Sequence, residues 1–393
     1  MIAALLLPEI QAFIRTERTL AERKALAFQK NPFPAVPWQL VLEQIESREK
    51  CREKLPLWAD TPNIIYPPAL SVEQTSSESL ARYKASLTNS SSLFDATGGF
   101  GVDAYYFSLH NKEVTYCEQN ADLAAIAQHN FKVLGSANMC AVSQNSETYL
   151  QETSENYNWI YLDPARRHDQ KGKVFRLEDC SPNVTEHLPL YFSKAANVLL
   201  KTAPFLDIQQ GLLTLKQVRE IHIVAYQGEV KELLWWLDGN YHDNPIFRAV
   251  ELHPKNAFSE TFTWNPETAS IPTSEPLAYL YEPHPSLMKG AAFIHLSEKY
   301  GVCQIHRHTH VFTHNERIDF PGKCYKIAQT IPYKKKELNA TIYGKAAHVV
   351  TRNFPEMVAQ LRKKWHITES ETNSLFFVKD KNDQLCVVRA QKV

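Results

Sequence analysis

Hydrophobic and polar residues alternate in two different ways along this chain of 393 residues. Residues 1–85 are expected to be mostly helical, because LEQIESREKCREKL carries mixed charges at helical spacing and SVEQTSSESLARYKASL has Ala, Leu and Tyr at helical spacing. From Ser91 onwards, short apolar runs alternate with helical patterns, and the expected strands are SSLFDA, EVTYCEQ, MCAVSQ, WIYLDP, NVLLKTAP and EIHIVAYQ. The pattern predicts a helical N-terminal region followed by an α/β, Rossmann-like domain, in which ligands bind beyond the carboxyl ends of parallel strands.

The pattern changes again towards the C-terminus. VKELLWWL is interpreted as a helix, and IFRAVEL with ETFTWN as a hairpin. The stretch NPETASIPTSEP is rich in Pro, Ser and Thr and is expected to link domains. Beyond it, the predicted helices SLMKGAAFIHLSEKY and FPEMVAQLRKKWHI lie among short strands, which indicates a small α+β module.

Composition limits the class of protein. Lys+Arg and Asp+Glu are balanced at 43 each, so any nucleic-acid surface must be a local patch. Seven scattered cysteines without a CxxC pair predict reduced thiols in the cytoplasm, and neither a disulfide framework nor a Cys-rich zinc site. No apolar run approaches membrane-spanning length, and the N-terminal run is broken by Pro8 and Glu9. We therefore expect a soluble protein of open oligomeric state.

A glycine-rich turn carries the main chemical signal. Three of only 12 glycines, Gly98, Gly99 and Gly101, fall within four positions between an expected strand and an expected helix. Glycines at such a turn allow the backbone to approach a cofactor closely and to adopt positive φ. The stretch from Gly99 to Ala104 matches the dinucleotide fingerprint GxGxxG/A, and Glu118 ends the next strand, where it could hold a ribose.

The carboxylates around this turn favour a different cofactor. Asp95 precedes the turn and Asp103 follows it, whereas a pyrophosphate would prefer free N–H groups without neighbouring negative charge. Carboxylates suit the ammonium and sulfonium charges of S-adenosylmethionine (SAM). Asn145, past the third strand, could face the adenine or simply form a turn. The candidate cofactor-binding residues are Asp95, Thr97, Gly98, Gly99, Gly101, Asp103, Glu118 and Asn145.

The loop after the fourth strand supplies the candidate catalytic residues. In a doubly wound sheet, Asp163-Pro164-Ala165-Arg166-Arg167 would face the same cleft as the glycine turn. Pro164 stiffens the loop, Asp163 could position the nucleophile, and Arg166 could hold a phosphate. The candidate catalytic set is therefore Asp163, Pro164 and Arg166.

These motifs resemble those of a known family. DATGGFGVD, CEQN and YLDPARR are similar, in order and spacing, to motifs I, II and IV of class I SAM-dependent methyltransferases. DPAR resembles the DPPR/DPPY element of methyltransferases that act on nucleic-acid bases. Here Ala165 replaces the second proline, and Arg166 replaces the aromatic residue that stacks on the target base in amino-methylating enzymes. The target atom is therefore left open.

The resemblance extends to the rest of the chain. YLYEPHPSLMKGAAFIHLSEKYGV, THVFTHN, FPGKCYKI and RNFPEMVAQLRKKWHI look like a bacterial, especially Bacteroidetes, methyltransferase family. The family implies a catalytic domain, a ferredoxin-like segment and a THUMP-like domain, and by analogy an RNA substrate such as an rRNA or tRNA base. The expected boundaries are 1–85 for the helical region, 86–270 for the methyltransferase domain, 275–316 for the ferredoxin-like segment and 317–393 for the THUMP-like domain.

Weaker signals concern substrate and metal. The candidate RNA-binding residues are Lys201 at the end of the fifth strand and Lys334, Lys335, Arg362, Lys363 and Lys364 in the last module. Gln74, Ser76 or Ser77 could contribute to the cofactor pocket or merely cap a helix. His306, His308 and His310 are expected on one face of a strand, without a further ligand at suitable spacing, so no metal is predicted.

The sequence predicts a SAM-dependent methyltransferase that acts by in-line displacement. Two alternatives remain open. One is an NAD(P)-dependent oxidoreductase, since the fingerprint also fits that cofactor. The other is a non-catalytic RNA-binding protein on a methyltransferase scaffold.

Overall fold

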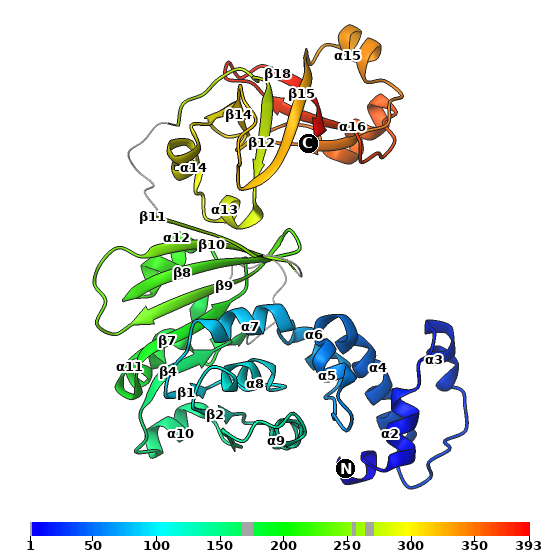
Figure 1. Ribbon diagram of the computed structural model, residues 1–393, viewed down its shortest axis with the longest axis vertical. Coiled ribbons are helices and arrows are strands. Elements are labelled where there is room, and N and C mark those ends of the chain that lie inside the picture. The colour runs from blue at the N-terminus through cyan, green and yellow to red at the C-terminus, as the bar shows by residue number, and fades with distance from the viewer. Residues whose placement is uncertain (1, 167–175, 254–256, 264–270) are drawn as a thin grey trace. The chain divides into compact units, whose positions relative to one another are not determined.

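The structure is a computed structural model that describes residues 2–166, 176–253, 257–263 and 271–393 (Figure 1). The described chain divides into two compact units. The first comprises Met1–Ile221 and Glu232–Asn244, and the second comprises His222–Lys231 and Pro245–Val393. The chain passes between them at the hairpin of β8 (Val218–Tyr226) and β9 (Glu229–Asp238).

The first unit contains the predicted βαβ pattern. Its other strands are β1 (Ser92–Asp95), β2 (Glu113–Cys117), β3 (Met139–Val142), β4 (Tyr157–Leu162) and β7 (Ala195–Thr202), and a small ribbon pairs β5 (Ala165–Arg166) with β6 (Cys180–Ser181). From β9 to its far edge, the main sheet has the order β9-β7-β4-β1-β2-β3, in which β7, β4, β1, β2 and β3 are parallel and β9 is antiparallel to β7. The order reverses direction at β1, so a cleft at the carboxyl ends of β1 and β4 is expected.

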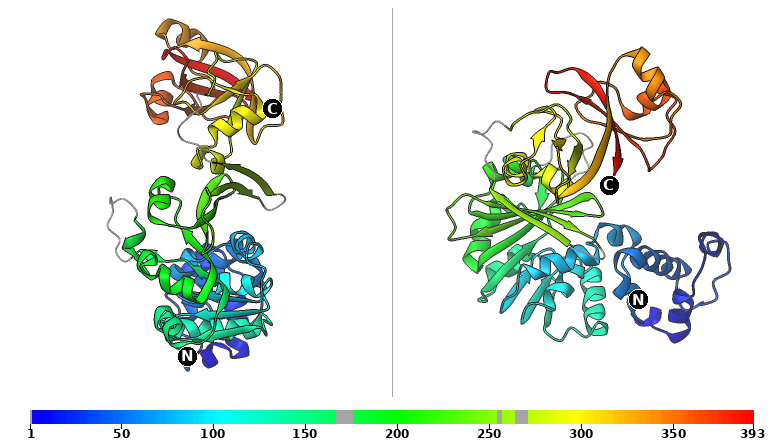
Figure 2. Two further views of the ribbon diagram at one scale, coloured as in Figure 1. Left: turned by 90° about the vertical axis from the view of Figure 1, so that its left-hand side faces the viewer. Right: turned by 45° about the horizontal axis from the view of Figure 1, so that its top comes forward.

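Helices connect these strands and form the N-terminal region. The N-terminal helices are α1 (Ile2–Leu5), α2 (Pro8–Arg15), α3 (Leu20–Leu26), α4 (Trp38–Lys54), α5 (Pro56–Asp60), α6 (Ala69–Gln74) and α7 (Glu78–Ser86). The later helices are α8 (Val102–Ser108), α9 (Ala121–Val133), α10 (Ser146–Glu152), α11 (Val184–Lys194) and α12 (Ile208–Thr214), with a 3₁₀ turn at Leu177–Asp179. The helices of residues 2–60 gather at one edge of the unit in Figure 1 and in the right-hand view of Figure 2.

The N-terminal helices pack against the sheet domain through buried contacts. Asn130 of α9 is fully buried and bonds the backbone of Ile65 twice, accepting from its N–H at 2.9 Å and donating to its C=O at 2.8 Å. The ring of Trp58 packs against that of Phe100 in the glycine turn, with centroids 4.8 Å apart. The helical region is therefore part of the wall beside the glycine turn.

The second unit contains a hairpin and a larger mixed sheet. The hairpin pairs β10 (Ile246–Leu252) with β11 (Ala257–Thr263). The larger sheet has the order β13-β14-β12-β15-β18-β17-β16 within the described residues. Its strands are β12 (Tyr279–Pro283), β13 (Cys303–Gln304), β14 (Phe312–His314), β15 (Gly322–Pro332), β16 (His348–Thr351), β17 (Ser374–Lys379) and β18 (Leu385–Lys392).

Four helices of this unit are described: α13 (Pro285–Lys289), α14 (Phe293–Tyr300), α15 (Lys335–Thr341) and α16 (Val358–Trp365). Leu338 of α15 and Leu361 and Trp365 of α16 are buried in one apolar cluster with Leu375 and Phe377 of β17. The neighbouring residues Phe376 and Val378 belong to a second cluster, because alternate strand residues face opposite sides of the sheet.

Three sequence interpretations are wrong. VKELLWWL forms strand β9 and not a helix, because its apolar residues are buried in a ladder with β7, in which Leu234 pairs with Lys201. Short apolar runs do not distinguish a buried strand from a helix by periodicity alone. SLMKGAAFIHLSEKY is two helices, interrupted where Ala291 adopts a φ of 49°.

The third concerns the histidines. His306, His308 and His310 lie in the turn between β13 and β14 and not on a strand. His306 is buried, its Nε2 lies 3.1 Å from Asp383 Oδ1, and its Nδ1 accepts from the His308 N–H. His310 stacks on Phe293 at 4.1 Å. His306 and His308 therefore contact each other, with ring centroids 5.6 Å apart, whereas His310 packs on Phe293.

Candidate functional site

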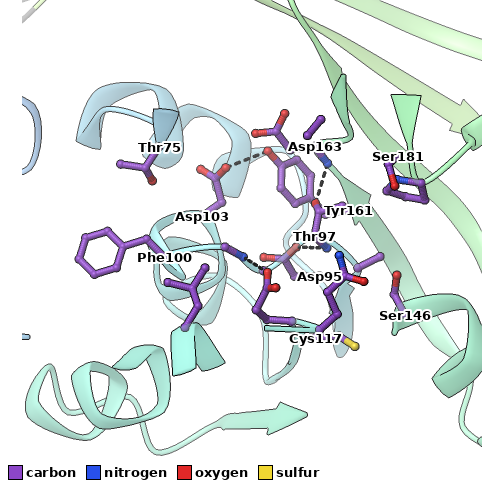
Figure 3. Close-up of a pocket in the computed structure, with 18 of the residues that line it drawn as sticks. Thr75, Asp95, Thr97, Phe100, Asp103, Cys117, Ser146, Tyr161, Asp163 and Ser181 are labelled. Carbon is purple, nitrogen blue, oxygen red and sulfur yellow. Dashed lines mark hydrogen bonds between the residues drawn. The ribbon is translucent and has the colours of Figure 1, made fainter. Parts of the chain in front are cut away.

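A cavity of about 680 Å³ opens at the carboxyl ends of β1, β2, β4 and β7 in the first unit. Figure 3 shows the side chains that converge there from the glycine turn, from the loop after β4 and from the connection between α6 and α7. The predicted residues that line it are Asp95, Thr97, Gly98, Gly99, Asp103, Glu118, Asn145, Asp163 and Lys201, together with Gln74 and Ser76. The topology thus brings most of the candidate set to one place.

The glycines of the turn are required by the packing of neighbouring rings as much as by the space that a ligand would need. A Cβ on Gly98 would lie 2.3 Å from the ring of Tyr116, and one on Gly101 would lie 2.6 Å from Phe131. Gly101 also has a φ of +87°, which disfavours other residues, and it does not line the cavity. Gly99, with a φ of +54°, donates its N–H to Glu118 Oε2 at 2.9 Å. Glu118 is therefore oriented by the turn itself.

Asp95 is a buried acid with an unused oxygen. Its side chain is 1% exposed, and Oδ1 accepts the N–H of Thr97 at 3.0 Å. Oδ2 is buried and has no hydrogen-bond partner among the described residues. Burial raises the pKa of Asp95 well above its usual value, and the nearby carboxylates Asp103, Asp163 and Glu118 raise it further. A cationic ligand would supply the missing partner.

Asp103 belongs to a buried network of charges. Its Oδ2 accepts hydrogen bonds from Ser76 Oγ at 3.0 Å and from Tyr161 Oη at 2.8 Å, and Lys84 Nζ lies 3.1 Å from Oδ1. Lys84 is fully buried and also lies 3.3 Å from Glu232 Oε2. Burial alone would raise the pKa of Asp103, but Lys84, Lys201 and the Tyr161 hydrogen bond lower it below its usual value. The network fixes one wall of the cavity.

The acid of the predicted catalytic loop is held from two sides. Lys201 Nζ at the end of β7 donates to Asp163 Oδ2 at 2.5 Å. The backbone N–H of Asp163 donates to Thr97 Oγ1 at 2.7 Å, which links this loop to the glycine turn. Burial alone would lower the pKa of Lys201, but Asp163, Glu232 and Asp103 raise it above its usual value. Lys201 therefore remains a cation paired with Asp163.

Other predicted residues lie elsewhere or are committed to local structure. Asn145 is the N-cap of α10, since its Oδ1 accepts from the Thr148 N–H at 2.9 Å. Pro164 does not line the cavity. The backbone of Arg166 pairs with Cys180, whereas the Arg166 side chain and all of Arg167 lie outside the described residues.

Several residues of the site were not predicted from the sequence. Lys84, Glu232 and Tyr161 complete the charge network, and Ser146 and Ser181 line the cavity. Lys84 lies on the buried face of α7, and Glu232 lies on a segment that was misinterpreted as a helix. A lysine and a glutamate among apolar neighbours were the available signals, because buried charges are rare unless paired.

The candidate RNA-binding residues of the second unit differ in their surroundings. Arg362 forms an ion pair with Glu369, and Lys364 forms one with Glu356 at 3.0 Å. Lys334, Lys335 and Lys363 are exposed. Lys335 and Lys364 line a cavity of about 780 Å³ with Tyr333, Tyr343 and Trp365.

No group of three or more His, Cys, Asp or Glu side chains is placed to hold a metal ion in the part of the chain that the structure describes. Among the same residues, no helix has the length and apolar character needed to cross a membrane.

Comparison with known proteins bears on the whole chain. A candidate methyltransferase from Porphyromonas gingivalis W83, known from its crystal structure, superimposes with a TM-score of 0.89 at 26% identity, covering 98% of each chain. A family of ferredoxin-like domains matches residues 279–321, and a family of THUMP domain-like sequences matches residues 322–390. This chain has a class I methyltransferase fold and a THUMP-like domain. The predicted resemblance and fold class are confirmed.

A curated relative matches a shorter part of this chain. Ribosomal RNA small subunit methyltransferase J of Desulfotalea psychrophila is 28% identical over 96 residues, which is 22% of this chain. The match spans 36% of that relative's length.

The ferredoxin-like and THUMP-like matches meet between β14 and β15, yet β12 and β15 pair in one sheet. The two domains therefore share a continuous backbone ladder.

Proposed function

We propose that this chain is a SAM-dependent methyltransferase that modifies RNA, with a base as its target. The observation that carries the proposal is the charge of the cavity beside the glycine turn. Asp95, Asp103, Glu118 and Asp163 line it, and the one basic residue among its described lining, Lys201, is already paired with Asp163. A diphosphate would meet unfavourable negative charge there, whereas a sulfonium nucleoside with an amino group would meet complementary charge.

The residues present fit SAM in its separate parts. The unpaired Oδ2 of Asp95 would accept from the ligand's ammonium group, and the Glu118 carboxylate, oriented by the Gly99 N–H, would bind the ribose hydroxyls. The cavity residues beside the Asn145 cap, including Ser146, would face the adenine. Thr97, Gly98 and Asp103 complete the proposed cofactor set, while Gly101 shapes the turn from behind.

The chain's own contribution to the reaction would be positioning. Bound SAM supplies an electrophilic methyl group. Asp163, fixed by Lys201 and Thr97, would orient the accepting atom of the target in line with that group through its Oδ1, which has no partner among the described residues. Placing two reactants in the correct geometry removes most of the entropic barrier. Pro164 and Arg166 are proposed to shape and neutralise the entrance of the same loop.

The RNA part of the proposal is supported by the THUMP-like match and by the rRNA methyltransferase relative. The exposed Lys334, Lys335 and Lys363 would contact the RNA backbone. Arg362 and Lys364 would do so only in competition with Glu369 and Glu356, because these acids already hold them.

Calorimetry and methyl transfer test the proposal together. We expect SAM to bind and NAD(P) not to bind, and we expect label from methyl-labelled SAM to enter RNA from a strain that lacks the gene. Binding of NAD(P) in place of SAM would overturn the proposal in favour of an oxidoreductase. RNA binding that is independent of SAM, with no labelled product, would leave only a non-catalytic scaffold.

A further inference from the structure

The chain places one aromatic side chain in solvent immediately after the strand that carries Lys201. Phe205 is 84% exposed and lies in the connection between β7 and α12. The other exposed phenylalanine among the described residues is Phe28, which is 91% exposed in the N-terminal region. An exposed aromatic residue is not unusual by itself, so its location and its support must decide its meaning.

Phe205 follows the end of β7, at the edge of the sheet where the cavity opens. β7 and β4 are parallel neighbours in register, with Leu200 opposite Leu162, so the residues that follow the two strands emerge at the same edge of the sheet. The ion pair between Lys201 and Asp163 joins these two edges. Phe205 follows Lys201 by four residues, and its Cα can lie no further than about 14 Å from that of Lys201.

The segment that carries Phe205 is well supported. The Leu206 N–H donates to the Ala203 C=O at 3.2 Å, which closes a turn with Pro204 and Phe205 at its centre. Leu206 is 1% exposed and anchors the turn, and the Asp207 side chain caps α12 by accepting from the Gln210 N–H at 2.9 Å. Phe205 is therefore presented at the tip of a fixed turn, while the residues on either side are committed to the fold.

Chemistry on a nucleobase requires that the base leave its stack and be held by a new stacking partner. Asp163-Pro164-Ala165-Arg166, the described residues that directly follow β4, contain no aromatic side chain, so these four positions cannot provide the partner. We propose that Phe205 is the aromatic surface against which the target base stacks. This inference rests on the proposed function and adds to it the residue that holds the base.

Four variants of the full-length chain test the inference: Phe205→Ala, Phe205→Leu, Phe205→Trp and, as a matched control at the other exposed phenylalanine, Phe28→Ala. The probe is RNA from a strain lacking the gene, separated into rRNA and tRNA fractions, with methyl-labelled SAM. We expect Phe205→Ala and Phe205→Leu to lower kcat/KM for RNA by about 5- to 150-fold, the range for removing one base–aromatic stack. Phe205→Trp should stay within about threefold of the wild type, because it keeps a flat π surface.

Binding of SAM separates this inference from the proposed function. The dissociation constant for SAM should be the same in all four variants and in the wild type, since neither Phe205 nor Phe28 is among the residues that line the cavity. Unchanged transfer by Phe205→Ala, or equal activity of Phe205→Leu and Phe205→Trp, would overturn the stacking role and leave the methyltransferase proposal intact. A wild-type protein that binds SAM but methylates no RNA would overturn both.

Discussion

The cavity and the THUMP-like domain use lysine in opposite ways. Lys84 and Lys201 are enclosed beside the cavity, and each is paired with carboxylates on other elements. Lys334, Lys335 and Lys363 in the second unit are exposed. A buried charge without its partner is costly, whereas an exposed one is solvated by water. The first group therefore shapes the fold and the site, and the second group is available to a partner.

The largest expected effect comes from removing the buried cation. Lys84→Met would leave Asp103 and Glu232 facing each other without compensation, at a cost of about 3–5 kcal/mol in the free energy of unfolding. Lys335→Met should change it by no more than about 0.5 kcal/mol. Urea denaturation compares the two variants. Adding Glu232→Gln to Lys84→Met should restore part of the loss, and an unchanged stability of Lys84→Met would contradict the buried-network interpretation.

Asp95 should control how SAM binding depends on pH. Because the free protein holds the pKa of Asp95 high, a ligand with an ammonium group must displace a proton, so SAM affinity should rise as pH rises towards that raised pKa. Asp95→Asn should remove this dependence and weaken binding about tenfold or more at pH 7, through the loss of a charge-assisted hydrogen bond. Calorimetry in buffers of different ionisation enthalpy measures the released proton.

Asp103 and Glu118 face the same space, so Asp103 must be considered as a second source of pH dependence. Its pKa is lowered, so its contribution to stability is present above the pKa of the unfolded chain and is lost as pH falls through the folded value. The contribution of Asp95 to stability changes in the opposite direction. Because the pKa of Asp95 is raised in the folded protein, the fold loses stability as pH rises towards that raised pKa. If Asp95→Asn kept the full pH dependence of SAM binding, Asp95 would not be the titrating group.

Lys201 should matter for transfer more than for cofactor binding. Lys201→Met removes the contact that holds Asp163 Oδ2, so kcat should fall on the order of tenfold while the affinity for SAM changes little. Lys201→Arg should recover part of the rate, because it keeps the charge in a different geometry. Single-turnover transfer with labelled SAM distinguishes this result from an RNA-phosphate role, which would raise KM and leave kcat unchanged.

The smallest effects should come from the exposed lysines. Lys335→Met with Lys363→Met should weaken RNA binding modestly and similarly for all sequences, and should lower the slope of log affinity against log salt by about 0.7 for each lost contact with single strands. Filter binding at several salt concentrations provides the slope. A large loss in the free energy of unfolding in this double variant would contradict the comparison, because it would show that these exposed lysines stabilise the fold as Lys84 does.

The sequence predicted the parallel strands, the glycine turn and the convergence of Asp95, Glu118 and Asp163, because these depend on local patterns and on the topology of doubly wound sheets. It did not predict the partners of charges. Lys201 was assigned to RNA phosphate, although its ion pair with Asp163 joins residues 38 positions apart in the chain. Glu232 was missed because the apolar run that follows it fits a helix or a buried strand equally well.

The paired hydrogen bonds between Asn130 and Ile65 have a practical consequence for dividing this gene product. An expression boundary at residue 86 would remove the main-chain groups that satisfy a fully enclosed amide, together with the tryptophan that covers the turn aromatic. The remaining sheet domain would expose the apolar surface that the removed helices cover, and it should aggregate when produced alone. Added back as a separate polypeptide, residues 1–85 would be expected to restore its solubility.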